Sequence, residues 1–542
     1  MFTGTICSIV CFVIQLIFWY VAKAPFNLNS SATWFEIIIF LISVAACYAF
    51  GSVNDDDDTA KVIASIAGSL CGIAVLVIVL GSWFSSDFFN SKEWYAKVSE
   101  MVTIIDDNDP TTPNAFPNLL GSNNDTSNLP LIGVPEAIKN SETQMGRQPA
   151  LGSQFELLEE EMTSQSINNS LMYVIPLEPK SMFKWDGENH GYFVIDRNNG
   201  NTEFVQESLK TTEKAPFGDN AKRIIYSYMR KNGIGGRITE LSPEINEEGE
   251  FMYVATVYKT NGIEGFDYVT GVVELNAKTQ ECQYYALDEI PEYIDRVFPE
   301  WLFDDYITYY GAYKNGWWNT MIGQKEVLEP TNGSDIVYID GVCWYYTGFT
   351  SAGKGESSNG IIMMNCRTGE IEYHKTYGIS EDKAQGVAEG RVQEKEYKAS
   401  YPLLLMVGGQ ETYFMLMRDN SNNLCGYSFV NYKDYSKASV AESLVDAQNA
   451  YIKSCSQSVS ADVLDNLDVS KGKAAITHIG SETKEGNTVW YIRMEGNTHI
   501  FSFQSSLEPD VVFAEVGDMA EVTYIEADSE VVSAISIDIK LE

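Results

Sequence analysis

The sequence predicts an α+β protein in three parts: transmembrane helices at the N-terminus, tandem β-hairpin/helix repeats, and a small C-terminal β-barrel. Uncharged apolar stretches fill most of the first 86 residues. A glycine-anchored strand pattern then occurs four times, and short alternating strands follow it. The predicted divisions are 1–86 for three transmembrane helices, 87–160 for a polar linker, 161–300 for repeats one and two, 301–335 for an aromatic joint, 336–460 for repeats three and four, and 461–542 for the barrel.

The N-terminal part contains three apolar stretches, at 1–22, 37–53 and 62–84, and none of them carries a charge. Crossing about 30 Å of hydrocarbon takes roughly 20 apolar residues. The first and third stretches are long enough, and the second suffices if its ends reach the head groups. The first has no basic region before it and no cleavage site, so we expect it to be retained. We therefore predict an integral protein of a bacterial cell membrane.

The charge of the chain excludes one class of partner. Its net charge is −38, and the part beyond residue 100 has 33 basic and 67 acidic residues, a net of −34. Such a body repels phosphate backbones, so we expect no nucleic-acid partner. Its total charge also gives no attraction to an anionic lipid surface. The nine cysteines include no CxxC pair, so neither a disulfide framework nor a zinc site is expected.

The side of the membrane on which the body lies is left open by the flanking charges. Lys23, Lys92 and Lys97 fall on the side of the body and Lys61 on the other. The positive-inside rule therefore favours a cytoplasmic body, by a margin of two charges. After the third stretch, residues 106–153 are rich in Asn, Asp, Pro and Ser, which is typical of a tether.

The repeats are aligned on four glycines, each followed by a mostly apolar strand and, five places later, by an Asp or Asn. The pairs are Gly191 with Asp196, Gly271 with Asn276, Gly360 with Asn365, and Gly426 with Asn431. An aromatic-rich apolar run precedes each glycine, so each copy predicts a β-hairpin closed by an Asx turn. An amphipathic helix follows in the clearest copies, with Ser380 as the N-cap of one. One unit alone cannot bury its sheet, so neighbouring units are expected to cover one another.

This order of strand, loop, strand with a D/N-xx-TG turn, and helix resembles the PepSY family of small α+β modules. The copy at 342–397, with NCRTGEIEYH, matches best. The whole chain resembles little-characterised bacterial multi-span membrane proteins with PepSY-like repeats, through SSDFFNSKEWYAKV, YGAYKNGWWN and ASYPLLL. The resemblance implies binding or inhibition instead of catalysis, and a body outside the cytoplasm. Beyond residue 461, five or six short alternating strands predict a small closed barrel of the OB or SH3-like kind.

Several motifs resemble catalytic or metal sites, and each is interpreted structurally. Gly348–Gly355 nearly matches a Walker A loop, but a glycine replaces its Ser/Thr and a strand follows it. The histidines, His190, His374, His478 and His499, lie far apart in sequence. Neither Asp55–Asp58 nor Asp106–Pro110 has the alternating ligands and glycine of a calcium loop. We therefore predict no catalytic residue, no cofactor and no metal.

Aromatic side chains crowd the segment between the second and third repeats: Tyr306, Tyr309, Tyr310, Tyr313, Trp317 and Trp318. The tyrosines recur at helical spacing. Asp304, Asp305 and Lys314 would make insertion into hydrocarbon expensive. Three interpretations stay open: a packing joint between the two pairs of repeats, a pocket for a peptide or glycan, and contact with lipid head groups.

Taken together, the sequence predicts a non-catalytic, membrane-anchored scaffold or binding protein that presents its repeats to a protein or envelope partner. The alternative is a regulator that inhibits a membrane or envelope hydrolase, either a protease or a wall hydrolase. The expected partners are the lipid bilayer and a protein of unknown identity, and assembly as a homo-oligomer is compatible with the repeats.

Overall fold

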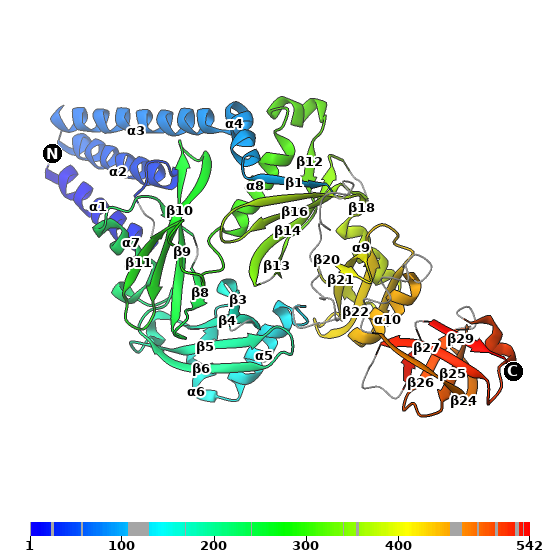
Figure 1. Cartoon of the computed structure of the whole chain (residues 1–542). Helices are drawn as coiled ribbons and strands as arrows, with labels where there is room; N and C mark the ends of the chain where they lie inside the picture. Colours follow the sequence, from blue (N-terminus) through cyan, green and yellow to red (C-terminus); the bar gives the residue numbers. More distant parts are fainter. Residues whose placement is uncertain are drawn as a thin grey trace.

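The structure, a computed structural model, consists of a helical bundle, a body of four β-sheets and a C-terminal sheet (Figure 1). It describes residues 2–22, 26–55, 58–106, 129–167, 170–239, 241–339, 341–353, 357–455, 469–484, 487–504, 508–525, 531–534 and 536–541. The chain is thus a mixed α+β protein, as the sequence predicts.

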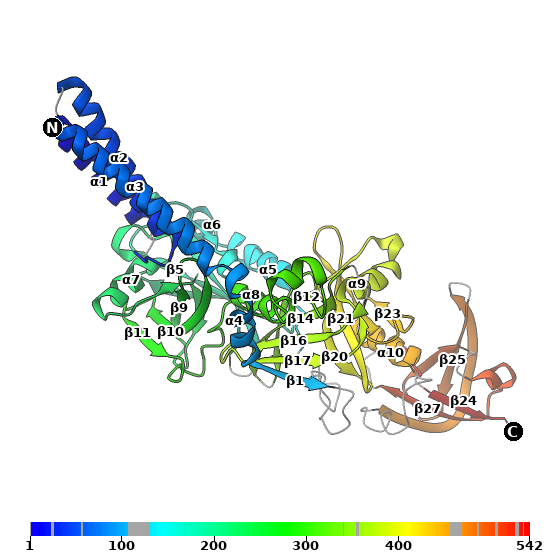
Figure 2. The same cartoon turned by 90° about the horizontal axis from the view of Figure 1, so that it is seen from above.

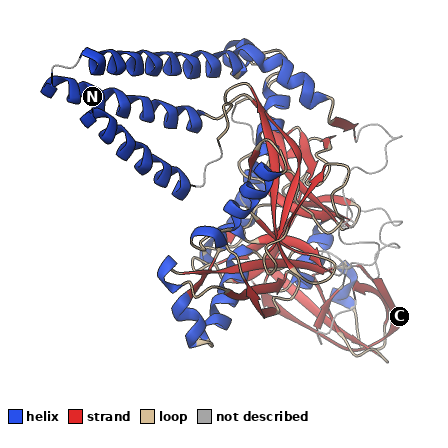
Figure 3. Ribbon diagram, turned by 90° about the vertical axis from the view of Figure 1, so that its left-hand side faces the viewer, coloured by secondary structure: helices blue, strands red, loops and turns tan. Residues whose placement is uncertain are grey.

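The bundle contains three helices that project together from one side of the body (Figures 2 and 3). They are α1 (Phe2–Ala22), α2 (Ser31–Asp55) and α3 (Asp58–Ser85). By length and composition, α2 and α3 are suited to cross a membrane, while α1 contains a shorter apolar stretch, Gly4–Tyr20. Membrane crossing by α1, and the membrane itself, therefore stay predictions.

The predicted polar linker begins with regular structure. Helix α4 (Asp87–Ser99) follows α3, and β1 (Val102–Asp106) then pairs in parallel with β17 of the body. Trp94 and Val98 lie four residues apart on α4 and are both buried. Residues at this spacing share one helix face, so α4 packs on the body, although it falls in the division 87–160 that the sequence assigned to a polar linker. Helices α5 (Val134–Gly146) and α6 (Pro149–Gln154) lie in the second half of the predicted linker.

Four sheets in chain order form the body, and each has the same plan. Two short strands both pair with one long strand. The long strand pairs on its other edge with the glycine-containing strand, and a last strand then pairs with the glycine-containing strand. The first sheet contains β2 (Phe155–Leu157), β3 (Thr163–Ile167), β4 (Ser170–Pro179), β5 (Asn189–Asp196) and β6 (Thr202–Leu209). The second contains β7 (Arg237–Ile238), β8 (Ser242–Ile245), β9 (Phe251–Asn261), β10 (Phe266–Asn276) and β11 (Cys282–Ala286).

The third and fourth sheets follow the same order. The third contains β12 (Leu328–Pro330), β13 (Asp335–Ile339), β14 (Val342–Ser351), β16 (Gly360–Asn365) and β17 (Ile371–Lys375), with β1 at its edge. The fourth contains β19 (Lys398–Ala399), β20 (Leu403–Val407), β21 (Gln410–Arg418), β22 (Leu424–Asn431) and β23 (Ala438–Ala441). A short pair, β15 (Ser357–Ser358) and β18 (Gly378–Ile379), lies outside them. A helix comes after each sheet: α7 (Ala221–Lys231), α8 (Glu300–Ala312), α9 (Glu381–Gly390) and α10 (Leu444–Cys455).

The four aligned glycines share one local geometry. A Cβ at Gly191, Gly271, Gly360 or Gly426 would lie 1.9–2.5 Å from a backbone oxygen of the last strand of its sheet. Three of them also have φ between 132° and 156°. The Asp or Asn that lies five places after each glycine also has the same local geometry in all four sheets. Its side-chain oxygen accepts a hydrogen bond from the backbone N–H two residues later. These contacts need glycine and Asx at fixed spacing.

Neighbouring sheets share their cores. One core joins the first and second sheets with α7, another joins the second and third with α4 and α8, and a third joins the third and fourth with α9 and α10. The fourth sheet also contacts α5, where Arg418 Nε lies 2.6 Å from Glu136 Oε1. Each sheet thus buries the face that it cannot cover by itself. Membership of the PepSY family stays a prediction.

The C-terminal unit is a sheet and not the closed barrel that the sequence predicts. Its strands are ordered β28 (Val531–Ser533), β26 (Ile500–Gln504), β25 (Asn487–Met494), β24 (Val469–Lys484), β27 (Met519–Ile525) and β29 (Ser536–Lys540). Long β24 pairs with β27 along its first half and with β25 along its second. In the described residues, β28 and β29 remain unpaired with each other, so the sheet is open. Alternation along strands predicts a buried face, but closure depends on pairing between the first and last strands.

Candidate functional site

A cavity of about 1470 Å³ lies where the helical bundle meets the second sheet. Its walls come from the last turns of α1, the segment before α2, helix α7, and strands β9 and β10. These elements are far apart in sequence, since α1 and α7 are separated by about 200 residues. The cavity therefore exists only because the bundle docks on the body.

Hydrogen bonds between the β9–β10 hairpin and the bundle hold this docking in place. Asn29 Nδ2 donates to the carbonyl oxygen of Thr260 over 2.8 Å. The backbone N–H of Ser31 donates to Glu264 Oε1 over 2.6 Å. At the tip, the N–H of Ile263 donates to Ser85 Oγ over 3.2 Å, at the end of α3. The hairpin thus binds the start of α2 and the end of α3 together.

Helix α7 supplies the basic wall. Its 11 residues, AKRIIYSYMRK, contain four basic side chains and no acidic one. Ile225 and Met229 lie on its buried face, and Arg230 and Lys231 are exposed at its end. On the first turn, Lys222 Nζ lies 2.8 Å from Glu213 Oε1, which ties α7 to the segment that follows the first sheet. The apolar spacing fixes which face of α7 is buried and leaves the basic residues toward the solvent and the cavity.

Arg223 spans the cavity from α7 to α1. Its Nε and Nη2 atoms donate to the carbonyl oxygen of Tyr20 over 3.3 and 3.2 Å, and its guanidinium lies 4.2 Å from the centre of the Tyr20 ring. The last carbonyl groups of a helix lack partners within the helix, and α1 has no basic residue of its own in its last turn. Arg223 therefore caps α1 from another part of the chain.

The opposite wall is apolar and open to solvent. Leu16, Phe26 and Leu28 line it with 42%, 63% and 51% of their surfaces exposed. Trp19 lies between them and contacts Phe26, with ring centres 6.5 Å apart. An exposed apolar wall facing basic side chains gives the cavity an amphipathic lining.

The charge of the cavity is positive. Its lining includes Arg223, Arg230, Lys231 and Lys259, and no Asp or Glu among the described residues. In that part of the chain, Arg230, Lys231 and Lys259 form no ion pair. Burial raises the pKa of Tyr226 and of Cys282 to about 12, so both of these lining groups are uncharged at neutral pH. An anion in the cavity would meet only cationic and neutral groups.

The aromatic residues that the sequence singles out lie elsewhere, on and after α8. Tyr306 is 2% exposed, stacks on Phe266 with ring centres 5.5 Å apart, and donates to the carbonyl oxygen of Asp267 over 3.0 Å. Tyr309 lies 4.8 Å from Trp94 of α4, measured between ring centres. Both tyrosines therefore fill the space between α8, α4 and the second sheet.

The next two tyrosines are also packed between elements. Tyr310 stacks between Tyr95 of α4 and Phe349 of the third sheet, at ring-centre distances of 5.8 and 6.4 Å. The hydroxyl of Tyr313 donates to Asp87 Oδ2 over 2.6 Å. These contacts connect the third sheet to the continuation of α3.

The two tryptophans differ in exposure. Trp317 is half-buried and packs on Phe88, with ring centres 4.9 Å apart. Trp318 is 61% exposed and is followed by exposed Met321 and Ile322, at 63% and 77%. The six aromatic residues that are close in sequence thus also lie at one junction in the structure. Trp318 is the exposed one among them.

The remaining motifs lie partly outside the described residues. Gly348 lies within β14, and Lys354 and Gly355 of the Walker-like loop lie outside the described residues. Residues 56–57 and 107–110 of the two acidic stretches also lie outside them. His190 contacts Asp186 over 3.4 Å and His374 contacts Glu372 over 3.0 Å. In the described residues, no histidine belongs to a group of three potential metal ligands.

Comparison with known proteins assigns no family. No protein-family model matches the chain, and no curated protein matches it. Partly similar solved structures are an ACO/RPE65 chimera (TM-score 0.13, 8% identity, 52% of this chain and 50% of the chimera) and the GH43_1 enzyme from Xanthomonas citri (0.18, 7%, 69% and 91%). A third is the alpha-L-arabinofuranosidase from Lactobacillus brevis (0.15, 9%, 69% and 92%). TM-scores this low assign neither fold nor activity.

Sequence reasoning missed the basic cavity. The net charge of −34 beyond residue 100 hides a helix that carries KR at its start and RK at its end. A count of charge by segment would have found α7, since a basic amphipathic helix is typical of a surface that contacts anionic groups. The apolar half of the site comes from α1, which the sequence assigned to the membrane, and from Phe26 and Leu28 in the segment before α2.

Proposed function

We propose that this chain is a membrane-anchored binding protein, and that its cavity holds the anionic head group of a membrane amphiphile such as a phospholipid. The observation that carries the proposal is the set of exposed basic side chains, Arg230, Lys231 and Lys259, in a cavity without a described acidic lining residue. The chain has 75 acidic and 37 basic residues, so uncompensated cations at one place need a physical reason.

The apolar wall supports an amphiphile over a small soluble anion. Leu16, Phe26 and Leu28 expose apolar surface that a hydrophilic anion would leave in contact with water. The volume of about 1470 Å³ exceeds the roughly 300–1,000 Å³ of ordinary small-molecule sites. A head group together with the first part of its acyl chains would occupy both walls.

The position of the cavity supports the same ligand. If α1, α2 and α3 cross a bilayer, their ends next to the body lie at the head groups, where Trp and Tyr are enriched in membrane proteins. Trp19 and Tyr20 lie in the last turn of α1 beside the cavity. The total charge still disfavours a general attraction to anionic lipid, so binding is confined to this basic site.

The test compares retention of two lipids that differ only in head-group charge. Full-length protein in detergent is incubated with dioleoyl phosphatidylglycerol or dioleoyl phosphatidylcholine, and bound lipid is counted by native mass spectrometry. A basic residue near an anionic surface contributes about 1 kcal/mol. Changing Arg230, Lys231 and Lys259 together to Gln should therefore weaken phosphatidylglycerol binding by about 100-fold.

The matched control removes three basic charges elsewhere. Lys395→Gln, Lys398→Gln and Lys433→Gln together change the net charge equally, on or beside the fourth sheet, where each lysine pairs with an acidic residue. This variant should bind phosphatidylglycerol as the unmodified chain does. Equal loss in both variants, or equal retention of the two lipids, would contradict the proposal.

The scaffold for a protein or envelope partner, and the alternative regulator of a hydrolase, stay predictions beside this function. Co-purification with a protease or wall hydrolase whose activity falls on binding would favour the regulator. Loss of a measured activity after substitution of His190 and His374, with folding retained, would instead favour an enzyme.

A further inference from the structure

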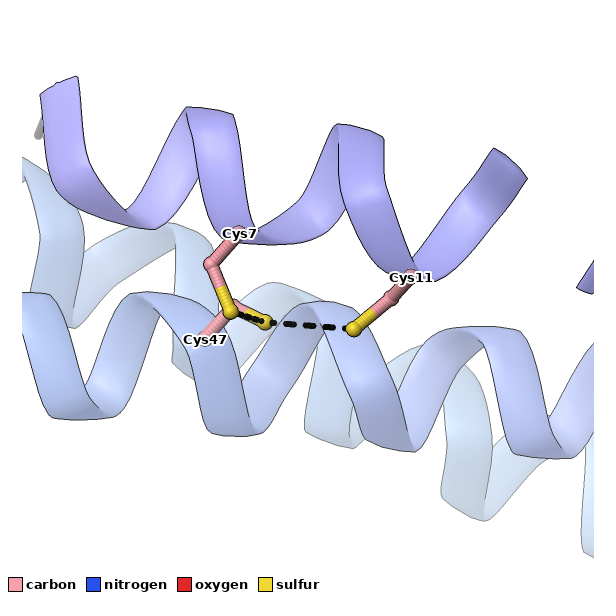
Figure 4. Close-up of side chains that lie close together, drawn as sticks. All are labelled: Cys7, Cys11 and Cys47. Carbon is pink, nitrogen blue, oxygen red and sulfur yellow. Dashed lines mark hydrogen bonds between the residues drawn. The ribbon is translucent and has the colours of Figure 1, made fainter. Parts of the chain in front are cut away.

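Three cysteine side chains converge between helices α1 and α2, outside the lining of the cavity. Cys7 and Cys11 lie one turn apart on α1, and Cys47 faces them from α2 (Figure 4). The sulfur of Cys47 lies 2.6 Å from that of Cys7 and 3.8 Å from that of Cys11. All three sulfurs lie within 4.8 Å of one another. Helical spacing of four places two thiols on one face, and helix packing adds the third.

Close packing of the two helices holds the sulfurs in place. A Cβ at Gly51 of α2 would lie 3.3 Å from the backbone nitrogen of Gly4 of α1, so the backbones approach closely there. The hydroxyls of Thr5 and Tyr48 are 2.9 Å apart and form a hydrogen bond between the same turns. Both contacts lie on the side of the cluster toward the start of α1 and the end of α2, and they hold the two helices together there.

We propose that Cys7, Cys11 and Cys47 form a binding site for a single copper(I) ion. Thiolates are soft ligands and select soft ions such as Cu(I). A structural zinc ion takes four ligands in tetrahedral geometry, and no fourth Cys, His, Asp or Glu joins this group in the described residues. Copper(I) accepts three sulfur ligands in a plane, which matches the number of donors. Binding releases thiol protons, so the affinity falls as the pH falls.

The spacing of one of the sulfur pairs is close to what such an ion requires. A metal about 2.3 Å from each of three sulfurs, as in metal–thiolate bonds, holds the sulfurs roughly 4 Å apart. The distance of 3.8 Å between Cys11 and Cys47 fits this geometry. Cys7, which is exposed at the bundle surface, would have to rotate away from Cys47 by more than 1 Å.

The test titrates copper(I) into full-length, reduced protein in detergent under anaerobic conditions, in competition with a chromogenic copper(I) chelator. The unmodified chain should bind one equivalent, and the variant Cys7→Ser, Cys11→Ser, Cys47→Ser should bind less than a tenth of that. Cys71→Ser on α3 removes a membrane-segment cysteine outside the cluster and should still bind one equivalent. X-ray absorption of the copper should show three sulfur neighbours.

A single substitution covers the case in which the triple variant does not fold. Cys11→Ser removes the cysteine that is not in the closest pair and should weaken copper(I) binding at least tenfold, with an unchanged circular dichroism spectrum. Equal binding by Cys11→Ser, or no binding by the unmodified chain, would overturn the proposal. A Cys7–Cys47 disulfide in protein isolated without reductant would also overturn it, because the pair would then be a structural bridge.

Discussion

Two of the contacts between the N-terminal helices α1–α4 and the body differ in chemistry. At the junction of α4 with α8, aromatic rings fill the space between the elements, and Tyr306 is 2% exposed. At the cavity, α1 and α7 stay apart, and the side chains between them are basic on one side and apolar on the other. The first contact is closed by packing, whereas the second leaves about 1470 Å³ unfilled.

This difference separates a structural role from a binding role. Interlocked aromatic rings gain contact area and dispersion energy from each other, so a ligand could enter only by displacing them. Basic side chains without acidic partners gain stability when an anion arrives. A concentration of aromatic residues in a sequence therefore does not by itself indicate a ligand platform, and in this protein the exposed basic side chains lie at the cavity and away from the aromatic junction.

The largest expected effect is at the packed junction. Tyr306→Ala removes a buried ring that stacks on Phe266 and a hydrogen bond to Asp267. Truncation of a large buried aromatic residue costs about 3–5 kcal/mol. Chemical unfolding of full-length protein in detergent should show this loss, while lipid retention per folded molecule stays unchanged. Tyr377→Ala, at a tyrosine that is 66% exposed, is the control and should change stability by less than about 1 kcal/mol.

A second effect depends on pH and concerns Glu178 of the first sheet. Glu178 is fully buried in the first sheet and accepts hydrogen bonds from the N–H groups of Glu213 and Lys214 over 3.0 and 3.2 Å. Burial raises its pKa from 4.5 to about 7. Since the folded state holds the proton more tightly than the unfolded state, the folded state loses stability as the pH rises from about 4.5 to about 7.

The variant Glu178→Gln stays uncharged throughout this range. Compared with the unmodified chain, it should be least stable at pH 5 and should recover by on the order of 3 kcal/mol at pH 8. Urea unfolding at both pH values measures this difference. Parallel profiles for the two proteins would show that Glu178 does not titrate in this range.

A third effect concerns the contact that closes one end of the cavity. Arg223→Lys loses the two hydrogen bonds from Nε and Nη2 to the carbonyl oxygen of Tyr20. Hydrogen bonds to charged groups contribute about 1.5–3 kcal/mol. Hydrogen exchange in residues 17–22 should therefore accelerate by about tenfold. Arg230→Lys keeps its charge, and among the described residues Arg230 donates no hydrogen bond to α1, so this variant should leave the exchange rate unchanged.

The parts of the fold that local rules determine could be predicted from the sequence. Gly191 and its three counterparts are set by close approach to a neighbouring strand, and the Asx turns by side chains two residues away, so both are visible as fixed spacings. The cavity could not be predicted, because it depends on how α1 lies against a helix 203 residues later in the chain. The open C-terminal sheet has the same explanation, since alternation gives strands but does not say which edges pair.

The smallest effect distinguishes the two tryptophans at the packed junction. Trp317→Ala removes a half-buried ring from Phe88 and should cost about 2 kcal/mol, below the range for full burial because part of the ring already contacts water. Trp318→Ala, at a ring that is 61% exposed, should cost less than about 1 kcal/mol in the same unfolding experiment. If Trp318→Ala leaves stability unchanged but reduces recovery of the protein with lipid vesicles, the exposed group of Trp318, Met321 and Ile322 contacts head groups. A loss of stability equal to that of Trp317→Ala would show instead that both rings belong to the junction. Trp318 would then be part of the packed contact.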